Sequence, residues 1–465
     1  MRCASMPGPP ARARNCAAPS KSSTASSSTD TSTSMQRSDS ASPGAVPRRR
    51  STEVAVIGGG VVGLAAALRL AADGREVLII EPNVPGAGAS YGNAATIATY
   101  AVLPVGTPAV LRSLPALLFD RASPLSIRTA ALPALAPWLL RFAWQSPPGR
   151  MHRNAAAIAE LLADAVPLWE ELTTAIGAAD LLRRDGCLYL YETASALRAA
   201  AWDTALRHDL GVALERLAPS EVAALEPGLP AMEGGAVFFP QAASLADPTR
   251  VMERLTAAAT AAGVEILAAA ASALERRNGG VHVTADTAEG GKTEVVAKTV
   301  VIAAGAHSRH LAVQAGDRVP LDTERGYHIE YDMETPPVSR PVCRVGRGFY
   351  FVPLRGRLRV VGTVELGGLK APPNPRRIDL LRQGAEEFFP GLGAPQRSWL
   401  GFRPSMPDSL PVIGSSRGGR DIILAFGHGH LGLTLAPVTA RLVSAIVDGR
   451  SNTPAPPACS PLRFA

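Results

Sequence analysis

The chain has 465 residues, 46% of them hydrophobic and 19% charged, which fits a large two-lobed protein or two to three domains and excludes a largely disordered chain. Its formal net charge is +7, but residues 1–50 contain eight basic and two acidic side chains, so the rest of the chain is close to neutral. This distribution gives no reason to expect nucleic-acid binding. The five cysteines form no CxxC pair, and we expect neither a disulfide framework nor a bound metal.

Residues 1–50 are rich in Ser, Thr, Pro, Ala and Arg and lack aliphatic periodicity, so we expect a disordered tail. Its composition matches a transit peptide, but we favour an extended start, with Met35 as an alternative first residue. Pro, Gly and Arg interrupt the apolar stretches 101–118 and 129–143, which are therefore no membrane spans. We expect a cytoplasmic protein. Residues 101–143 could rest peripherally on the inner membrane or be buried in the protein, and we favour burial.

The ordered chain begins with a pattern typical of a βαβ unit. Residues 53–57 form a β-branched run, residues 61–73 are predicted as a helix closed by Gly74, and residues 76–81 form a second strand. The intervening Gly58–Gly63 contains GxGxxG, whose first glycine permits a tight turn, whose second admits a pyrophosphate, and whose third allows close helix–strand packing. A carboxylate at the end of the second strand can bind ribose hydroxyls. The residues expected to bind the dinucleotide here are Gly58, Gly60, Val61, Val62, Gly63 and Glu81.

Further along the chain, helical and strand patterns alternate. Residues 101–180 are helical in character with Pro-marked breaks, and the subsequent predicted elements are strands at 183–192 and 235–240, a helix at 248–262, and strands at 264–267, 280–284 and 294–303. Between 324 and 365 the alternation is typical of an antiparallel sheet, and helices follow at 376–389 and 434–448. The fold class is therefore α/β (α+β overall), with a Rossmann-like nucleotide-binding lobe assembled from discontinuous segments and an antiparallel-sheet substrate lobe.

The expected domain boundaries follow from this order of elements. They are a disordered tail (1–50), the first part of the nucleotide lobe (51–100), a helical region with the first part of the substrate lobe (101–240), the middle of the nucleotide lobe (241–316), the antiparallel substrate sheet (317–400), the last part of the nucleotide lobe (401–449) and a C-terminal tail (450–465).

Three features favour FAD over NAD as the dinucleotide. The fingerprint lies at the start of the ordered chain, a second strand ends in Val300–Ala306 with Gly305, and a glycine-rich segment returns near the C-terminus. An NAD-dependent dehydrogenase would not require the last two features.

The sequence resembles the D-amino-acid dehydrogenase and glycine oxidase family of FAD-dependent amine oxidoreductases over residues 53–449. The resemblance rests on five segments: Gly58–Gly63, Gly88–Ala95, Gly348–Pro353, Gly401–Gly414 and Gly427–Thr434. Together with Glu324–His328, the last segment also resembles a subgroup that includes D-hydroxyproline dehydrogenases.

The resemblance implies roles for individual residues. Ser90 and Asn93 match the positions where the family passes its chain along the flavin, and the 427–434 loop matches the segment at the isoalloxazine ring. From that loop we expect cofactor contacts by Gly429, His430, Gly432 and Thr434. Arg403 matches the arginine that binds the substrate carboxylate, and Tyr350 matches a substrate-lobe tyrosine. No cysteine lies between 344 and 458, so non-covalent FAD is expected.

The residue chemistry agrees with oxidation of a small amino acid, in particular a D-amino acid. A guanidinium fork holds both oxygens of a carboxylate, and the flavin accepts a hydride from the α-carbon, giving an imine that becomes an oxo acid, or stays cyclic for a proline. Arg403, Tyr350 and His428 are the candidate catalytic residues. The alternatives are a surface ion pair for Arg403, core packing for Tyr350 and a structural role for His428.

Three other functions share some of these motifs. An oxygen-using oxidase of the glycine or sarcosine type shares all of them, and peroxide formation would distinguish it from a dehydrogenase that passes electrons to a quinone or the respiratory chain. An NAD-dependent dehydrogenase would be colourless. A non-catalytic binding module acting through the basic tail would lose its function when the tail is deleted.

Overall fold

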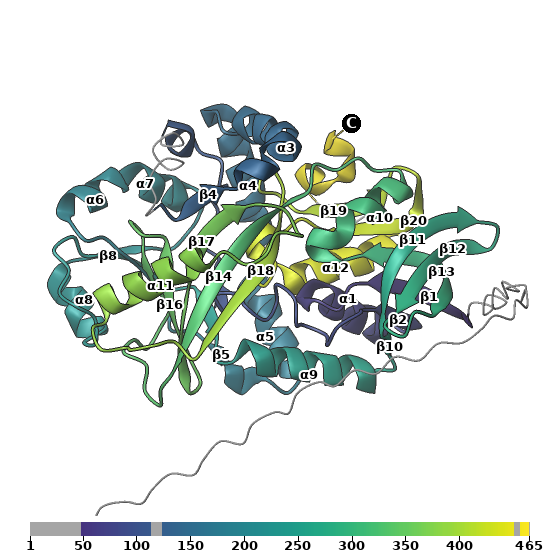
Figure 1. Cartoon of the computed structure of the whole chain (residues 1–465), viewed down its shortest axis with the longest axis horizontal. Helices are drawn as coiled ribbons and strands as arrows, with labels where there is room; N and C mark the ends of the chain where they lie inside the picture. Colours follow the sequence, from purple (N-terminus) through teal and green to yellow (C-terminus); the bar gives the residue numbers. More distant parts are fainter. Residues whose placement is uncertain (1–47, 113–122, 451–455, 465) are drawn as a thin grey trace, which may run out of the picture. The chain divides into compact units, whose positions relative to one another are not determined.

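The computed structural model describes residues 48–112, 123–450 and 456–464 (Figure 1). The nucleotide lobe is built on a sheet whose parallel strands come from distant parts of the chain, in the order β10 (Glu265–Leu267), β2 (Val77–Ile80), β1 (Arg48–Ile57), β13 (Lys292–Ile302) and β20 (Gly419–Phe426). Alternate residues of β1 enter two different apolar clusters, Val54 and Val56 on one face and Ala55 and Ile57 on the other. Burial of both faces explains the near-continuous apolar runs of these strands. The predicted assembly from discontinuous segments is confirmed.

Strand β1 begins earlier than the apolar pattern indicated. Arg48 to Thr52 pair with β13 from Thr293 to Ala297, so the last three residues assigned to the tail belong to the sheet. Backbone pairing extends the strand past its buried part, and no apolar pattern marks such an extension. Residues 1–47, and with them most of the predicted tail, lie outside the described residues.

Helices cover both faces of the parallel sheet. On one face lie α1 (Val61–Ala72), α5 (Ala165–Ala175), α9 (Pro248–Ala261) and α12 (Ala436–Val447), and on the other lies α10 (Ser308–Ala315). Two antiparallel strands, β11 (Ala269–Arg277) and β12 (Gly280–Thr287), extend the sheet beside β13, and β19 (Val412–Ser416) pairs antiparallel with β20.

The substrate lobe contains a large mixed sheet, antiparallel from its first strand to its fifth. Its order is β18 (Arg397–Ser405), β14 (Asp322–Asp332), β17 (Arg357–Leu366), β16 (Phe349–Leu354), β15 (Val342–Arg344), β6 (Cys187–Leu190), β8 (Ala236–Phe239) and β7 (Glu215–Leu217), with β4 (Leu125–Ile127) beside β17. The predicted antiparallel region is confirmed. The predicted boundary at residue 400 divides β18 between the lobes, but this strand pairs with β14 continuously as far as Ser405, so the substrate sheet extends into the predicted nucleotide segment.

The two faces of the substrate sheet have different neighbours. On the outer face, Phe351 and Val360 pack against α11 (Pro375–Phe388), while on the face that we call the inner face, Val352 and Val361 join the apolar cluster of the nucleotide lobe. The inner face therefore looks toward the nucleotide lobe, and the side chains that it carries are those available to a site between the two sheets.

The remaining elements surround these sheets. They are a small sheet of β3 (Thr96–Ile97), β9 (Ala243–Leu245) and β5 (Leu182–Arg183), and the helices α3 (Leu132–Gln145), α4 (Pro148–Leu162), α6 (Ala194–Ala199), α7 (Ala201–Asp209) and α8 (Pro219–Leu225). Among the residues that the structure describes, no helix is both long and apolar enough to cross a bilayer.

Candidate active site

The glycines of the dinucleotide turn are required by close backbone approaches. Gly58 has a φ of +108°, and a Cβ there would lie 2.5 Å from the carbonyl oxygen of Ala303 at the end of β13. A Cβ on Gly63 would collide with the carbonyl oxygen of Gly58. Only glycine fits at both positions, so α1 packs directly against the strands that it connects.

The start of α1 is open toward a ligand. Gly60 is the N-cap and provides no side-chain cap, and the nearest atom to a Cβ built on it is the Ser90 hydroxyl, 3.4 Å away. The N–H of Val61 donates to Ser90 Oγ at 2.9 Å, and the N–H of Gly59 donates to Glu81 Oε2 at 2.7 Å. Val62 is half-buried in the same first turn. The positive end of the α1 dipole and the glycine backbone fit a pyrophosphate, and the Glu81 carboxylate fits a ribose.

Ser90 and Asn93 belong to a loop whose carbonyl groups are held by the substrate lobe. Asn93 bonds within the loop, donating to Ser90 O and accepting from Ala95 N, both at 2.7 Å. Arg359 Nη1 donates to the carbonyl oxygens of Tyr91 at 3.0 Å and Asn93 at 2.8 Å.

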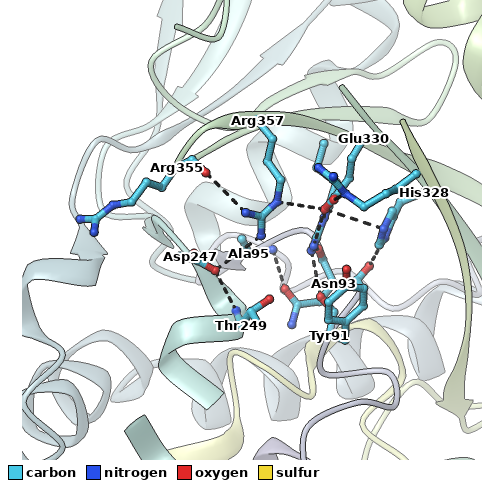
Figure 2. Close-up of polar contacts among 12 residues, drawn as sticks. Tyr91, Asn93, Ala95, Asp247, Thr249, His328, Glu330, Arg355 and Arg357 are labelled. Carbon is cyan, nitrogen blue, oxygen red and sulfur yellow. Dashed lines mark hydrogen bonds and ion pairs between the residues drawn. The ribbon is translucent and has the colours of Figure 1, made fainter. Parts of the chain in front are cut away.

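The intervening carbonyl oxygen, that of Gly92, lies 3.2 Å from His328 Nδ1 (Figure 2). A Cβ on Gly92 would collide with the ring of Trp399, so the loop backbone lies directly against β18. Residues Tyr91 to Asn93 are thus fixed from the inner face of the substrate sheet.

A buried carboxylate, Glu330, binds the arginine that holds the Tyr91–Asn93 loop. Its Oε1 accepts from Arg359 Nε at 2.8 Å and from Arg357 Nε at 3.2 Å, and its Oε2 accepts from Arg397 Nε at 2.8 Å. Burial alone would raise the pKa of Glu330, but these guanidinium groups lower it to about 2. The pKa of His328 is lowered to about 3 by burial and by the charge of Arg359, so its ring is neutral. We call Glu330, Arg357, Arg359 and Arg397 the closed cluster.

Arg403 lies on the same inner face but has no such partner. Its guanidinium covers Gly326 on β14, where a Cβ would collide with it, and Nη1 is 3.5 Å from the carbonyl oxygen of Thr363. Within the described residues it has no ion pair shorter than 4.0 Å. Burial lowers its pKa, and the charge of Glu324 opposes that shift, so Arg403 keeps its positive charge.

A β-bulge in β17 presents the Thr363 carbonyl to Arg403. Between Arg325 and Tyr327, β14 advances two residues while β17 moves from Glu365 to Gly362, so β17 contains one extra residue. Thr363 has a φ of +59° at this place, and its buried hydroxyl has no hydrogen-bond partner among the described residues. The strained backbone supports a functional role for this corner of the sheet.

The late glycine-rich loop lies beside Arg403. Gly429 begins the short 3-10 helix η4 (Gly429–Leu431), which contacts β18, and Gly432 is its C-cap. His430 is exposed, and desolvation by the neighbouring protein together with the charge of Arg403 lowers its pKa to about 4. Backbone and ring are therefore available to a ligand at this position.

Other predicted residues of this loop are turned into the fold. His428 is 3% exposed, and its Nε2 lies 2.9 Å from the Thr439 hydroxyl, while burial lowers its pKa to about 4. Thr434 Oγ1 accepts from Ala98 N at 3.0 Å and is fully enclosed. The predicted catalytic role of His428 does not agree with this placement. Its ring and the Thr434 hydroxyl hold the loop in place, and the Thr434 carbonyl oxygen accepts from Trp169 Nε1 at 3.2 Å, so Thr434 is enclosed by protein.

Tyr350 lies on the inner face of β16. Strand β17 separates β16 from β14, the strand that pairs with β18 beside Arg403. The Tyr350 hydroxyl is 2.7 Å from that of Tyr189, and burial raises the pKa values of both phenols. Tyr100 packs edge-on against Tyr189, with its hydroxyl 3.2 Å from Cys187 Sγ. Half-buried Tyr350 is the exposed end of an aromatic cluster that could line a substrate pocket. Gly305, with a φ of +55°, starts the 3-10 helix η3 (Gly305–His307) beyond β13 and contacts β18 through that helix.

Two groups of residues were missed by sequence reasoning. Glu324, Glu330 and Arg359 are buried charged residues within strands, which is a signal in itself, because charged side chains are almost never fully buried unless they are paired. In the same set, Arg357 is half-buried and Arg397 is exposed. Their grouping depends on cross-strand register, which the sequence does not contain.

Comparison with known proteins agrees with this geometry. A profile of the DAO family, described as FAD dependent oxidoreductase, matches residues 53–446. The chain belongs to this family. It is 35% identical over 424 residues to a D-amino-acid oxidase of Bradyrhizobium diazoefficiens, covering 88% of this chain and 98% of that protein. It is 32% identical to a D-amino acid dehydrogenase of Paramagnetospirillum magneticum, covering 86% and 96%.

Solved structures share the fold of this family member. Glycine oxidase from Geobacillus kaustophilus superposes with a TM-score of 0.67 at 24% identity, over 88% of this chain and 98% of that chain. L-proline dehydrogenase from P. horikoshii gives a TM-score of 0.66 at 19% identity, over 90% and 98%. FAD is the cofactor of the family, and the open helix N-terminus with Glu81 fits its dinucleotide part.

Proposed function

We propose that this flavoenzyme oxidises the α-carbon of a small D-amino acid. Hydride leaves the α-carbon while the nitrogen lone pair forms the C=N bond, and hydrolysis of the imine gives an oxo acid, or a cyclic imine persists when the substrate is a proline. Non-covalent FAD, when bound, supplies the two-electron acceptor. The preference for the D series rests on the names of the relatives, because the shared fold also occurs in an L-proline dehydrogenase.

The observation that supports this proposal is the unpaired guanidinium of Arg403. Arg403 is half-buried, and one long contact with Thr363 is the only hydrogen bond that the described residues provide for its guanidinium group. A substrate carboxylate would supply the missing bidentate partner. Because Arg403 lies on the inner face, the bound carboxylate would point the α-carbon into the space between the lobes, with Tyr350 toward the substrate side chain.

The protein's part in the reaction is orientation and exclusion of water. Gly58 to Gly63, Glu81 and Ser90 would hold the dinucleotide, the Tyr91–Asn93 loop would pass along the flavin, and backbone groups of Gly429 to Gly432 would face its ring. Fixing both reactants at hydride-transfer distance is worth several kcal/mol of the barrier.

Anaerobic flavin bleaching tests this proposal. We expect the yellow protein to lose its absorbance near 450 nm with D-amino acids and to keep it with the L enantiomers, in a panel that includes D-proline and cis-4-hydroxy-D-proline. Rapid bleaching by cis-4-hydroxy-D-proline above all others would support the D-hydroxyproline subgroup. Bleaching by L but not D substrates would overturn the stereochemical assignment, and no bleaching by either would overturn the function.

For the electron acceptor we propose a quinone of the respiratory chain. The alternative, an oxygen-using oxidase, is favoured by one specific observation, since the 35% identical relative is named an oxidase. The two functions differ in stoichiometry. An oxidase forms one peroxide per substrate in air, whereas the dehydrogenase turns over only with a quinone or dye.

Helix α3 offers the contact that a membrane quinone requires. Leu140 and Trp144, one turn apart, are 73% and 64% exposed, and Arg150 lies 3.8 Å above the Trp144 ring. Together with exposed Leu132 they form an apolar ridge bordered by positive charge, as in helices that rest on anionic lipid. The expected burial of the 129–143 stretch is confirmed for one face of α3, through Leu135, Trp138 and Phe142, whereas Leu140 on the other face is exposed.

A vesicle flotation assay tests this contact. We expect binding to vesicles containing phosphatidylglycerol, and its loss in the double variant Leu140→Ser with Trp144→Ser, which should keep dye-linked activity. The matched control, Trp202→Ser, changes another exposed tryptophan on α7 and should leave flotation unchanged. Equal flotation of all three proteins would contradict the proposal.

A further inference from the structure

We propose that Glu324 binds the ammonium group of the substrate and accepts its proton, so that the amino acid is held as a zwitterion between Arg403 and Glu324. This inference rests on the proposed function, and it assigns to the same site the base that oxidation of an amine requires.

The position of Glu324 carries the proposal. It is the direct cross-strand partner of Arg403 in the pairing of β14 with β18, so both side chains leave the inner face from adjacent positions, with Cβ atoms about 5 Å apart. The carboxylate and the amino group of an α-amino acid are one carbon apart. Two opposite charges at neighbouring positions of one sheet face therefore match the two ends of this substrate.

The two groups do not neutralise each other in the fold. No ion pair within 4.0 Å joins them among the described residues, because the Arg403 guanidinium lies over Gly326, two residues further along β14. Glu324 is only 8% exposed and has no ion pair within 4.0 Å among the described residues. A buried carboxylate without an ion pair is costly unless a cation joins it.

The surroundings of Glu324 suit a proton acceptor. Burial raises its pKa, whereas Arg403 and the Ser405 hydroxyl oppose the shift. Two other titratable groups lie near this part of the face: Asp322, two residues earlier on β14, whose pKa is also raised by burial, and His430, whose pKa is lowered in part by the charge of Arg403. Leu366, the partner on β17, is apolar. A raised pKa brings the carboxylate closer to that of the ammonium group and favours proton transfer between them.

The proposed step is the transfer of one proton from the substrate ammonium group to Glu324. One N–H bond of the ammonium group breaks and one O–H bond forms on Glu324, which leaves a neutral amine and a carboxylic acid. The nitrogen lone pair then becomes available for the C=N bond as hydride leaves the α-carbon. The proton on Glu324 returns to solvent after the product leaves.

Glu324→Gln tests the step through the pH dependence of anaerobic flavin reduction. In the wild type, the second-order rate constant should reach a plateau above the pKa of Glu324 and persist until the substrate ammonium loses its proton. In the variant, only the minor neutral amine reacts. Its rate constant should fall about 1,000-fold at pH 7, rise about tenfold per pH unit, and approach the wild type near pH 10.

Two comparisons separate this role from a structural one. Asp322→Asn, on the same face of the same strand, should keep the wild-type pH profile, and Glu324→Asp should recover part of the lost rate at pH 7. Cyclopentanecarboxylate, which has a carboxylate but no amine, should perturb the flavin spectrum of Glu324→Gln at least as strongly as that of the wild type, whereas D-proline should bind the variant more weakly.

Failure of the role proposed for Glu324 can be distinguished from failure of the proposed function. A rate lowered equally at every pH, or a profile identical to the wild type, would overturn the role of Glu324 while leaving the proposed function intact. If no D-amino acid reduces the wild-type flavin, the proposed function itself fails. Retained yellow colour and a melting temperature no lower than that of the wild type would confirm that the variant is folded.

Discussion

Two arginine–glutamate sets lie on the inner face of the substrate sheet, six residues and about 20 Å apart along β14. In the closed cluster, Glu330 receives hydrogen bonds from three arginines, and Arg359 also donates to two loop carbonyls. At the other end, Glu324 and Arg403, which we call the open set, are direct cross-strand neighbours and stay unpaired with each other. Arginine and glutamate stabilise the fold in the closed cluster, where each charge has a partner. At the other end of β14 the same residue types are available to bind a ligand, because they are not paired with each other.

Removal of the charge of Glu330 tests whether the closed cluster stabilises the fold. Glu330→Gln leaves Arg359 buried without a counter-charge, so we expect the free energy of unfolding to fall by about 3–5 kcal/mol. The measurement is urea denaturation of the FAD-bound protein. Fluorescence titration should also show weaker FAD binding, because the clamp on Tyr91 and Asn93 loosens. Glu324→Gln, the matched change in the open set, should lose little or no stability, and equal losses would refute the distinction.

Removing the open arginine should affect catalysis and not folding. For Arg403→Ala we expect kcat/KM for the D-amino acid to fall about 100-fold, through KM, since a charge-assisted bidentate contact is lost. FAD should stay bound. Arg403→Lys should be intermediate because an ammonium group lacks the fork. Arg420→Ala, an exposed arginine on β20, is the control, and unchanged kinetics of Arg403→Ala would remove the carboxylate-binding role.

Gly326→Ala alters the open set without changing any charge. The new methyl group would displace the Arg403 guanidinium from its place on β14, so we expect KM to rise about tenfold with normal FAD binding, equivalent to about 1.4 kcal/mol. Steady-state kinetics measure this effect. Gly346→Ala, at a position with free space around it, should behave as the wild type. If both variants matched the wild type, the packing of Arg403 on Gly326 would be irrelevant to binding.

The smallest expected effect is an opposite dependence of stability on pH. Glu330, with a pKa lowered to about 2, contributes stability that is complete above about pH 4.5 and is lost as the pH falls toward 2. Glu324, with a raised pKa, contributes stability that is complete below its ordinary value and is lost as the pH rises through the raised one.

Melting curves of the two glutamine variants against the wild type check these signs. Between pH 5 and 8 the melting temperature of Glu324→Gln should gain about 1–3 °C relative to the wild type, whereas the deficit of Glu330→Gln should stay constant and shrink only below about pH 4.5. Parallel curves for both variants would contradict the assignment of directions.

Local chemistry was predictable from the sequence, and cross-strand geometry was not. Gly58 and Gly63 were identified because backbone contact requires glycine wherever the βαβ turn occurs. Arg403 was found through its motif, but the absence of an internal partner could be seen only when Thr363 and Gly326 were placed around it.

The two histidines of the late loop show the limit of motif reasoning. His428 and His430 are two residues apart in one glycine-rich segment, yet the first is bonded to Thr439 and the second is open to solvent. Which ring faces inward is decided by α12 packing, and no local pattern reports it. The start of β1 at Arg48 was missed for a related reason, because backbone pairing with β13 does not need apolar side chains.

The clamp of Arg359 on Tyr91 and Asn93 has a consequence for biogenesis. All residues of the phosphate-binding turn lie in the first part of the chain, but the turn packs against Ala303, and the loop that follows it is fastened by a residue more than 260 positions later. The residues of the turn are therefore synthesised long before either contact can form. Stable capture of the cofactor must wait until translation of the substrate lobe is nearly finished.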